Sequence, residues 1–299
     1  MSAHSPYTPD LLADKRILVT GGGTGLGRGV AERLVEHGAQ VHLWGRRPEV
    51  LAQAAEAIGQ GRPGDSVHFQ TVDVRDGAPV DAAMEQLWQD HGPLTGVVNN
   101  AAANFIAPTE TLSPNAFDAV SSTVMKGSFH TTLAAGRRWI AEGLPGSVLS
   151  TLTTWVWTGS AFVVPSAMGK AAVHAMTMSL GVEWARYGIR VNAVAPGPIP
   201  TDYAWEMLNP TDSSSVGATQ CDQIPMQRMG TVEELANLMM FLLSDACPYL
   251  TGQTIAMDGG QMLAGPNTFA GLSTLSTDDW AEIRETSKRA SAAGKAQRG

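Results

Sequence analysis

Short apolar runs alternate with helical patterns along the chain, from about residue 16 to about residue 258. The run RILVT at Arg16–Thr20 predicts a buried strand, because it is short, rich in β-branched residues and followed by glycines. Further strands are predicted at Ala39–Gly45, Ser66–Val74, Leu94–Asn100, Ser147–Thr153, Ile189–Gly197 and Gln253–Gly260. Helices are predicted from the glycines to about His37, and at Pro48–Ile58, Ala78–Asp90, Asn115–Glu142, Ser166–Tyr187 and Val232–Leu243. This order predicts a doubly wound α/β fold, with a seven-stranded parallel sheet and helices on both faces.

The pattern places one main domain between two extensions. Residues 1–14 form an N-terminal extension and 15–260 the domain; 261–299 form a tail with a helix at Asp278–Arg289 and a frayed basic end. The segment at about 201–229 breaks the rhythm directly after a strand. A long connection in that place is typical of a lid over a binding site, and a floppy insertion is the alternative.

Composition indicates a soluble, folded protein that binds neither nucleic acid nor membranes. The 299 residues are 43% hydrophobic and 16% charged, which provides enough apolar material for a sizeable core. The 20 basic and 28 acidic side chains give a net charge of -8, whereas nucleic-acid binders are usually basic. No stretch reaches the roughly 20 apolar residues that span a bilayer, and the N-terminus lacks the apolar core of a signal peptide. The 2 cysteines have neither metal nor redox spacing, which favours a cytoplasmic protein without a metal site.

A glycine-rich loop joins the first predicted strand to the first predicted helix. Glycine permits positive φ and close approach of another group to the backbone, and the following helix presents free N–H groups and a positive dipole end. Because the loop opens a βαβ unit, it predicts a site for the pyrophosphate of a dinucleotide and not only a turn. The expected contacts are Gly21, Gly23, Thr24, Gly25, Leu26 and Gly27.

Two arginines follow the second strand, at the place where an acidic residue would hold the ribose 2′-hydroxyl of NAD(H). Arg46 and Arg47 stand there, and the first acidic residue is Glu49. Guanidinium groups match the geometry of a 2′-phosphate, so the sequence favours NADP(H) as the cofactor. The alternative is that both arginines are solvated side chains ahead of the next helix.

Several motifs in this order resemble the short-chain dehydrogenase/reductase family, which has a Rossmann fold. Thr20–Gly27 matches the family's TGxxxGxG pattern, Asn99–Ala102 is similar to its NNAG segment, and Pro196–Ile199 is similar to the segment beside the nicotinamide carboxamide. The resemblance covers about residues 15–260. The further cofactor contacts that it implies are Asp73, Val74, Asn100, Ala101, Ala102, Lys170, Pro196, Gly197, Ile199 and Thr201.

Within that family the chain looks most like the 2,4-dienoyl-CoA reductases. The stretches NNAAANFIAPTETLSPNAF, TGSAFVVPSAMGKAAV, VAPGPIPT and RMGTVEELANL carry this likeness, which continues into the tail near Asp278–Ile283. The resemblance implies NADPH-dependent conjugate reduction of a small-molecule substrate, an unsaturated acyl-CoA or a related thioester. It also implies a homotetramer, with the long helices at Asn115–Glu142 and Ser166–Tyr187 at the interface.

The catalytic positions depart from the family pattern. The family uses Tyr-x-x-x-Lys, and here Ser166 stands four residues before Lys170. Thr153 stands where the family has a serine, and Lys126 where it has an asparagine. The dienoyl-CoA reductases place their tyrosine 15 residues before the lysine, and that position is Trp155 here. Neither tyrosine position therefore holds a phenol.

The loss of the phenol has a chemical consequence. Carbonyl reduction makes an alkoxide and needs an acid of suitable pKa, which neither a serine hydroxyl nor an indole provides. Conjugate reduction delivers hydride to carbon and builds charge on the thioester oxygen, so the site needs hydrogen-bond donors at that oxygen. Indole, hydroxyl and ammonium groups can all donate. The expected catalytic set is Lys170, Lys126, Ser166, Thr153 and Trp155, which disfavours an ordinary alcohol dehydrogenase.

Several of these residues have a second interpretation. Lys126 is either an electrostatic group beside the reacting carbonyl or a surface lysine that reaches solvent. Ser166 and Thr153 are either active-site contacts or structural hydroxyls. Trp155 and Trp157 alternate, so an extended loop would put both on one side, as a pocket wall or as packing beneath the lid.

The sequence is compatible with three functions. The first is NADPH-dependent reduction of an activated C=C bond. The second is other chemistry in a reductase-derived site, such as isomerisation or cyclisation of a specialised metabolite. The missing phenols favour it, although Tyr203 in the lid is a candidate replacement and Trp205 could also reach the substrate. The third is a catalytically degenerate protein that binds NADP(H) without turnover.

Overall fold

The computed structural model describes residues 5–62, 64, 66–104, 106–201, 221–265, 272 and 275–296. Within these ranges seven strands form one sheet in the order β3-β2-β1-β4-β5-β6-β7, and every neighbouring pair is parallel. Their bounds are β1 Arg16–Thr20, β2 Gln40–Gly45, β3 Val67–Thr71, β4 Gly96–Asn99, β5 Gly146–Thr151, β6 Ile189–Pro196 and β7 Thr254–Met257. The predicted fold class is confirmed, and each strand lies within its predicted range or begins one residue before it.

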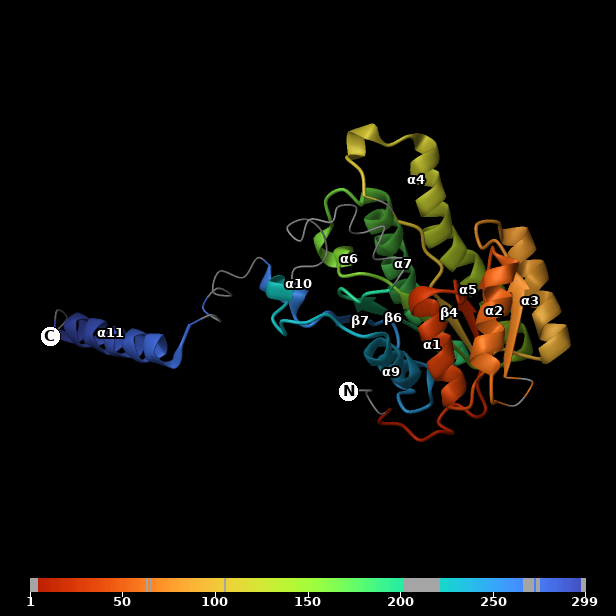
Figure 1. The fold of residues 1–299 in the computed structure, drawn as a ribbon, viewed down its shortest axis with the longest axis horizontal. Coiled ribbons are helices and arrows are strands. Elements are labelled where there is room, and N and C mark those ends of the chain that lie inside the picture. Colours follow the sequence, from red (N-terminus) through yellow and green to blue (C-terminus); the bar gives the residue numbers. More distant parts are fainter. Residues whose placement is uncertain are drawn as a thin grey trace.

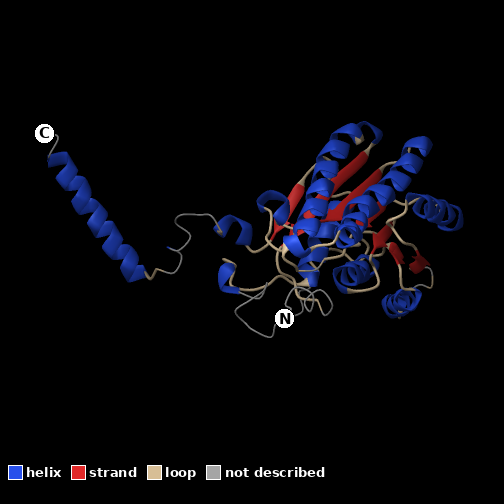
Figure 2. Cartoon of the chain, turned by 90° about the horizontal axis from the view of Figure 1, so that it is seen from above, coloured by secondary structure: helices blue, strands red, loops and turns tan. Residues whose placement is uncertain are grey.

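Helices cover both faces of the sheet (Figures 1 and 2). α1 (Gly25–Glu36), α2 (Pro48–Gly59) and α9 (Val232–Leu243) pack on one face, and α3 (Gly77–His91), α5 (Gly127–Glu142) and α7 (Val164–Glu183) pack on the other. The shorter elements are η1 (Thr109–Thr111), α4 (Pro114–Ser121), η2 (Ser122–Lys126), α6 (Trp155–Thr158), η3 (Ala185–Tyr187), η4 (Cys221–Gln223) and α10 (Gln261–Ala264). In the described ranges, no helix has the length and apolar character needed to cross a membrane.

Side chains along β1 alternate between the two larger core clusters. Ile17 and Val19 face the cluster formed with α1, α2 and α9, whereas Leu18 faces the cluster formed with α3 and α5. All three side chains are fully buried. Burying a side chain of this size stabilises the fold by about 1.5–3 kcal/mol. Because helices cover both faces, the strand carries a continuous apolar run, which is the signal that the sequence shows.

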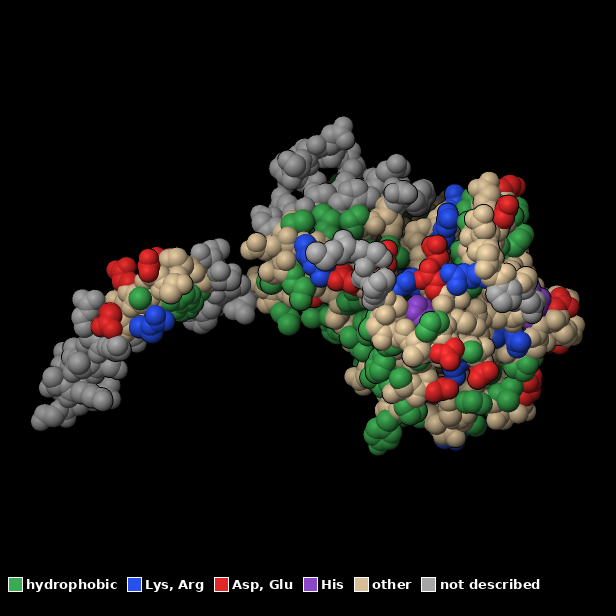
Figure 3. Space-filling model, turned by 60° about the horizontal axis from the view of Figure 1, so that its bottom comes forward, with side chains coloured by type: hydrophobic (Ala, Val, Ile, Leu, Met, Phe, Trp, Pro, Cys, Tyr) green, Lys and Arg blue, Asp and Glu red, His purple; other side chains and the backbone are tan. Residues whose placement is uncertain are grey.

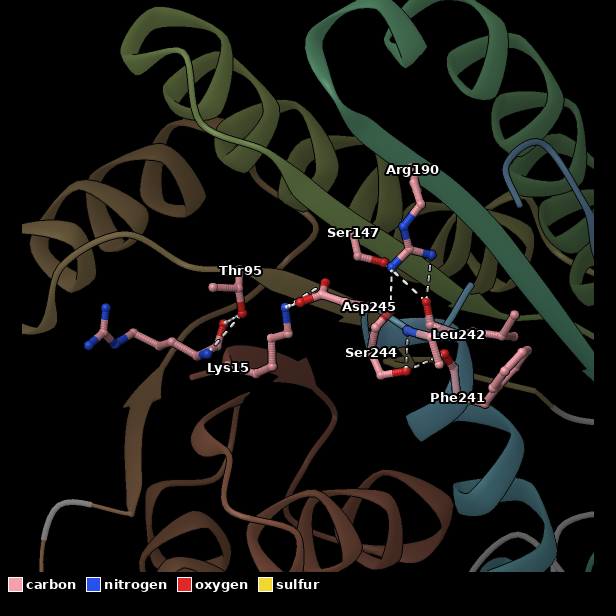
Figure 4. Close-up of polar contacts among 10 residues, drawn as sticks. Lys15, Thr95, Ser147, Arg190, Phe241, Leu242, Ser244 and Asp245 are labelled. Carbon is pink, nitrogen blue, oxygen red and sulfur yellow. Dashed lines mark hydrogen bonds and ion pairs between the residues drawn. The ribbon is translucent and has the colours of Figure 1, made fainter. Parts of the chain in front are cut away.

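Polar side chains fix the end of α9 at the amino end of the sheet (Figure 4). The Arg190 guanidinium donates to the carbonyl oxygens of Leu242 at 2.7 Å and Ser244 at 3.0 Å. Lys15 pairs with Asp245 at 2.7 Å. The arginine satisfies carbonyl groups that the end of a helix leaves unpaired. These contacts hold α9 against β6 at the end of the sheet opposite to the loops after the strands.

The region Asn115–Glu142 is helical throughout, as the sequence pattern predicts, but a π-helical turn of 5 residues lies within it. α4 ends at Ser121, the π-helical segment η2 runs to Lys126, and α5 follows. A π-turn accommodates one extra residue between two α-helical segments and leaves the apolar periodicity on both sides intact. The periodicity therefore could not reveal the interruption.

The C-terminal helix α11 (Thr277–Ala296) stands apart from the domain (Figures 1 and 2). Its start is fixed by Ser276, whose N–H and hydroxyl donate to the Asp279 carboxylate at 2.8 and 2.6 Å. Figure 3 shows acidic and hydrophobic side chains on its described surface. The helix extends beyond the predicted Asp278–Arg289 at both ends, and the frayed basic end stays a prediction. Residues 202–220, most of the predicted lid with Tyr203 and Trp205, lie outside the described residues.

Candidate active site

A groove of about 580 Å³ lies at the carboxyl ends of β1 and β4, where the strand order of the sheet reverses. Successive connections leave such a point toward opposite faces of the sheet, which opens a crevice for a ligand. The predicted cofactor residues that line the groove are Gly21, Gly23, Thr24, Gly25, Leu26, Arg46, Arg47, Asp73, Val74, Asn100, Ala101, Ala102 and Thr201. The fold thus brings most of the predicted contacts into one groove, from loops far apart in the sequence.

Glycines allow the loop after β1 to pack closely against α1. Gly21 and Gly25 have φ angles of +66° and +54°, which L side chains rarely adopt. A Cβ added at Gly27 would lie 2.3 Å from the carbonyl oxygen of Gly21 and 2.5 Å from the Asn100 side chain. Thr24, the N-cap of α1, makes no side-chain hydrogen bond to the first turn. The N–H groups of that turn can therefore bind an anion, which fits the pyrophosphate of a dinucleotide.

Thr20 and Asn100 join the floor of the groove across β1 and β4. The Thr20 hydroxyl oxygen accepts hydrogen bonds from the N–H groups of Asn100 and Ala101, both at 3.0 Å. The Asn100 side-chain amide donates back to the carbonyl oxygens of Thr20 at 3.2 Å and Gly21 at 3.4 Å. The similarity of Asn99–Ala102 to the family's NNAG segment therefore corresponds here to a brace that fixes the glycine loop.

Charged side chains surround the part of the groove after β2 and β3. Arg46 and Arg47 are exposed and line the groove. Arg75 pairs with Asp73 at 2.5 Å. The hydrogen bond from Arg75 lowers the pKa of Asp73, and the charge of Arg46 adds to the effect. Asp73 is therefore an ionised carboxylate at neutral pH, and the two arginines present positive charge where a ribose 2′-phosphate is expected.

Five predicted cofactor residues do not line this groove: Gly27, Lys170, Pro196, Gly197 and Ile199. Gly27 supports the loop by close packing. Pro196 ends β6 in buried surroundings, and the Gly197 N–H donates to the Met257 carbonyl at 3.0 Å. Ile199 packs into the core cluster of α9. Cofactor contacts of the last four residues stay predictions.

The groove also contains residues that sequence reasoning missed: Trp44, Gly45, Val50, Leu51, Val72, Ala103, Asn104 and Thr123. Gly45 and Val72 directly precede the predicted contacts Arg46 and Asp73 at or just after the ends of their strands, so the strand pattern could have identified them. Thr123 lies in η2, and its hydroxyl donates to the Ala119 carbonyl at 2.9 Å. No motif marks that position.

Ser166 and Lys170 occupy one buried face of α7, since they are four residues apart. The Lys170 ammonium donates a hydrogen bond to the carbonyl oxygen of Thr151 at the end of β5. Burial lowers the pKa of Lys170 to about 8, because a charge is poorly solvated in the interior. A buried amine whose pKa is close to neutral is typical of functional sites.

Thr153 and Trp155 lie in the connection from β5 to α7. The Thr153 hydroxyl oxygen is buried and has no hydrogen-bond partner among the described residues, although buried polar atoms usually have one. Trp155 is half-buried at the start of α6, and Trp157 is exposed. Residues two apart in a helix lie about 200° apart around its axis, so the two indoles do not share one side. The prediction of an extended loop was wrong here.

Lys126 is the last residue of η2, and its side chain is exposed. The segment itself packs against α7: a Cβ added at Gly169 would lie 3.1 Å from the Val124 side chain. Lys126 therefore lies at the end of a segment that contacts α7 next to Lys170. Its exposure fits the interpretation as a surface lysine, and its electrostatic role stays a prediction.

Residues 21–262 of the chain match the family model described as enoyl-(acyl carrier protein) reductase. "Probable 2,4-dienoyl-CoA reductase 3 [(3E)-enoyl-CoA-producing]" of Caenorhabditis elegans is 39% identical over 284 residues, which are 94% of this chain and 92% of the relative. "Probable 2,4-dienoyl-CoA reductase [(2E)-enoyl-CoA-producing]" of Bacillus subtilis is 40% identical over 250 residues, which are 83% of this chain and 97% of the relative.

Solved structures share the fold over most of the chain. The gluconate 5-dehydrogenase from Burkholderia cenocepacia, in complex with NADP and tartrate, has a TM-score of 0.78 and 30% sequence identity. The match covers 85% of this chain and 98% of that one. Together with the glycine loop, the groove at the strand reversal and Lys170 on α7, these matches place the chain in the short-chain dehydrogenase/reductase family of NAD(P)-dependent oxidoreductases.

Proposed function

We propose that the protein is an NADPH-dependent reductase of an activated carbon–carbon double bond in an unsaturated acyl-CoA or related thioester. The observation that carries this proposal is the site around Lys170. A buried ammonium, a buried threonine hydroxyl without a partner in the described ranges and an indole lie near the end of β5, and no phenol occupies either family tyrosine position. Such a site offers donors for a developing enolate oxygen but no acid suited to an alkoxide.

The residues of the groove and of the site around Lys170 have separate roles in the proposed reaction. A bound NADPH supplies hydride to a carbon of the conjugated system. The first turn of α1 holds the pyrophosphate, and Arg46 and Arg47 hold the 2′-phosphate. Lys170 orients the nicotinamide ribose. The Thr153 hydroxyl and the Trp155 indole donate to the thioester oxygen as negative charge builds there.

Two further groups complete the proposed site. Ser166 adds a hydroxyl on the buried face of α7, and Lys126 adds positive charge from η2. Water delivers the final proton to carbon, so the site needs no side chain that acts as the acid for this step. The binding of the whole substrate then depends on the loops beyond β5 and β6.

The proposal also includes a quaternary structure and a location in the cell. The protein is a cytoplasmic homotetramer in this proposal, assembled through α5 and α7. Exposed apolar side chains on these helices, Phe129, Met178 and Val182, support that interface. The absence of metal-ligand or redox spacing for Cys221 and Cys247 supports a reducing compartment.

The direct test is the oxidation of NADPH with 2,4-hexadienoyl-CoA, followed by the absorbance of the cofactor at neutral pH. The proposal expects one NADPH consumed per product formed, and a loss of turnover of at least about 100-fold in Lys170→Ala, because that change removes both the ribose contact and the positive charge. A Gln53→Ala variant on the exposed face of α2 serves as the matched control. No oxidation by the folded wild type across short, medium and long dienoyl and enoyl thioesters, with NADPH bound, would overturn the proposal.

A second candidate function is non-redox chemistry in the same site, which the missing phenols favour. In that case the protein converts a substrate without any net change in the cofactor absorbance. A strict one-to-one requirement for NADPH removes this candidate. Tight binding of NADP(H) without turnover of any substrate would instead indicate a catalytically degenerate protein.

A further inference from the structure

His174 links α7 to two neighbouring elements. It lies four residues after Lys170, on the helix face that also carries Ser166. Its Nδ1 lies 2.8 Å from the hydroxyl oxygen of Thr254, the first residue of β7. The same imidazole meets the Trp157 ring edge-on, with centroids 5.7 Å apart and an angle of 71° between the planes. The three side chains therefore form a continuous connection from the sheet, through α7, to α6.

The connection matters because α6 is too short to hold its own position. The helix has four residues, and its backbone hydrogen bonds stay within residues 153–159. Two of its side chains have identified contacts with the domain. Val156 packs against the small core cluster that contains Val173, and Trp157 packs on His174. Of these two contacts, only the second is tied to the sheet by a side-chain hydrogen bond, through Thr254.

The geometry of a helical turn then gives Trp155 its direction. Successive residues are about 100° apart around the axis. With Val156 on the core and Trp157 on α7, Trp155 occupies the third side of the turn. If either attachment is lost, α6 can rotate, and the Trp155 indole turns with it.

We propose that His174 is a positioning residue, which holds Trp157 against α7 and thereby fixes α6 and the indole of Trp155 at the reacting thioester. This inference rests on the proposed function, because it assigns a purpose to the orientation of Trp155. An edge-on aromatic contact and a neutral hydrogen bond each shift a local equilibrium by about 2- to 10-fold. When both contacts are lost, the population of molecules in which α6 is detached should therefore rise by about 10-fold or more.

The test compares three variants at one position. His174→Phe keeps a ring against Trp157 and loses the bond to Thr254; His174→Asn keeps an amide near Thr254 and loses the ring; His174→Ala loses both. Hydrogen exchange of the peptide covering residues 153–160 reports on α6 without substrate or cofactor. We expect exchange to quicken about 10-fold in His174→Ala and by about 3-fold in the two partial variants.

Kinetics with 2,4-hexadienoyl-CoA and NADPH provide the second readout. We expect kcat to fall about 10-fold in His174→Ala, with the Kd for NADPH within twofold of wild type. The double variant His174→Ala/Trp157→Ala should be no slower than the slower of its single variants, because both changes break one connection. His37→Asn, at the end of α1, controls for the loss of a buried histidine and should leave kcat unchanged.

The outcomes separate the two proposals. If the wild type does not oxidise NADPH with any thioester, the proposed function fails while the exchange data still test the attachment of α6. Unchanged exchange over residues 153–160 in folded His174→Ala overturns the positioning role, as does additivity of the two alanine variants. A fall in kcat that merely follows a loss of folded protein, measured by circular dichroism, also overturns it.

Discussion

The ammonium of Lys170 donates a hydrogen bond to the backbone carbonyl of Thr151 inside the domain. Burial lowers the pKa of this amine from 10.5 to about 8 in the folded protein. Between these two values the unfolded chain binds more protons than the folded one, so the free energy of unfolding rises with pH across that range. Below pH 8 both states carry the proton, and the folded state bears the full cost of the buried charge.

The variant Lys170→Met removes the titrating group at similar volume. Relative to this variant, we expect the wild type without cofactor to gain about 3 kcal/mol of unfolding free energy as pH rises from 7 to 10.5. Urea unfolding at a series of pH values measures the difference. Parallel pH profiles for the two proteins would show that Lys170 is not perturbed by burial.

Arg46 and Arg47 should select the phosphorylated cofactor. A charge-assisted hydrogen bond is worth about 1.5–3 kcal/mol, so Arg46→Ala/Arg47→Ala should weaken NADPH binding by at least about 10-fold. NADH, which has no 2′-phosphate, should bind with nearly unchanged affinity. Fluorescence titration of both cofactors measures this, with the exposed Arg137→Ala on α5 as the control. An equal loss for both cofactors would contradict the assignment.

Gly27 should not tolerate a side chain. In Gly27→Ala the new Cβ would lie 2.3 Å from the Gly21 carbonyl oxygen, so the loop after β1 has to move away from α1. We expect a loss of unfolding free energy of about 1–3 kcal/mol and a loss of cofactor binding of at least 10-fold. Thermal unfolding and cofactor titration measure the two effects.

Gly59 provides the matched control for that substitution. It ends α2, and an added Cβ there has no neighbour within 4 Å. Gly59→Ala should therefore leave cofactor binding unchanged and stabilise the protein by up to about 1 kcal/mol. Similar behaviour of the two alanine variants would mean that the loop after β1 is not tightly packed.

His42 should make the fold sensitive to acid. Its ring lies 5.0 Å from that of His68 and 4.8 Å from that of His91, between centroids, and it is buried. Burial, followed by the charges of His68, His91 and Arg16, lowers the pKa of His42 from 6.5 to about 3. The unfolded chain therefore binds more protons between pH 3 and pH 6.5, and the free energy of unfolding falls as the pH drops through this range.

The variant His42→Phe keeps a ring and removes the titration. Relative to it, the wild type should lose about 3 kcal/mol of unfolding free energy between pH 7 and pH 4. Chemical unfolding in buffers across this range provides the measurement. If both proteins lose the same unfolding free energy between pH 7 and pH 4, the titration of His42 does not cause the acid sensitivity.

Val182 tests the proposed assembly through α5 and α7. Its side chain is 82% exposed on α7, which is unusual for a valine on a helix of a soluble domain. Val182→Glu should dissociate the tetramer, because it places a charge in an apolar interface. Light scattering after size-exclusion chromatography measures the mass. Gln53→Glu on α2 adds the same charge outside that face and should leave the assembly intact; an unchanged mass of Val182→Glu would exclude this interface.

The sequence pattern predicted the regular elements well where a clear local signal marks an end of the element. β1 and α9 match their predictions residue for residue, since glycines end the first and a capping box of Thr231 and Glu234 begins the second. The glycine loop, the arginines after β2 and the residues after β4 were likewise predicted, and all their predicted contacts except Gly27 line the groove. These signals are local, so one sequence is enough to read them.

The remaining features depend on contacts that no local pattern encodes. The π-turn before α5 and the short helix α6 arise from packing against α7, and so Thr123 and the orientations of Trp155 and Trp157 were not predicted. The bond from His174 to Thr254 joins residues 80 positions apart, so its spacing carries no signal either. The residues that depart from the family pattern were thus visible in the sequence, but the packing around Trp155 required the structure.

The strand order has a consequence for how the chain is made. The strands β3, β2, β1 and β4 are adjacent in the sheet and all come from residues 16–99. Synthesis proceeds from the amino end, and folding units form as they emerge. The strands that carry the glycine loop and both arginines are therefore made before Lys170, but the core cluster behind them also needs α9, which is made after it. The two halves of the groove are therefore expected to become rigid together, once α9 has packed against β1 and α1.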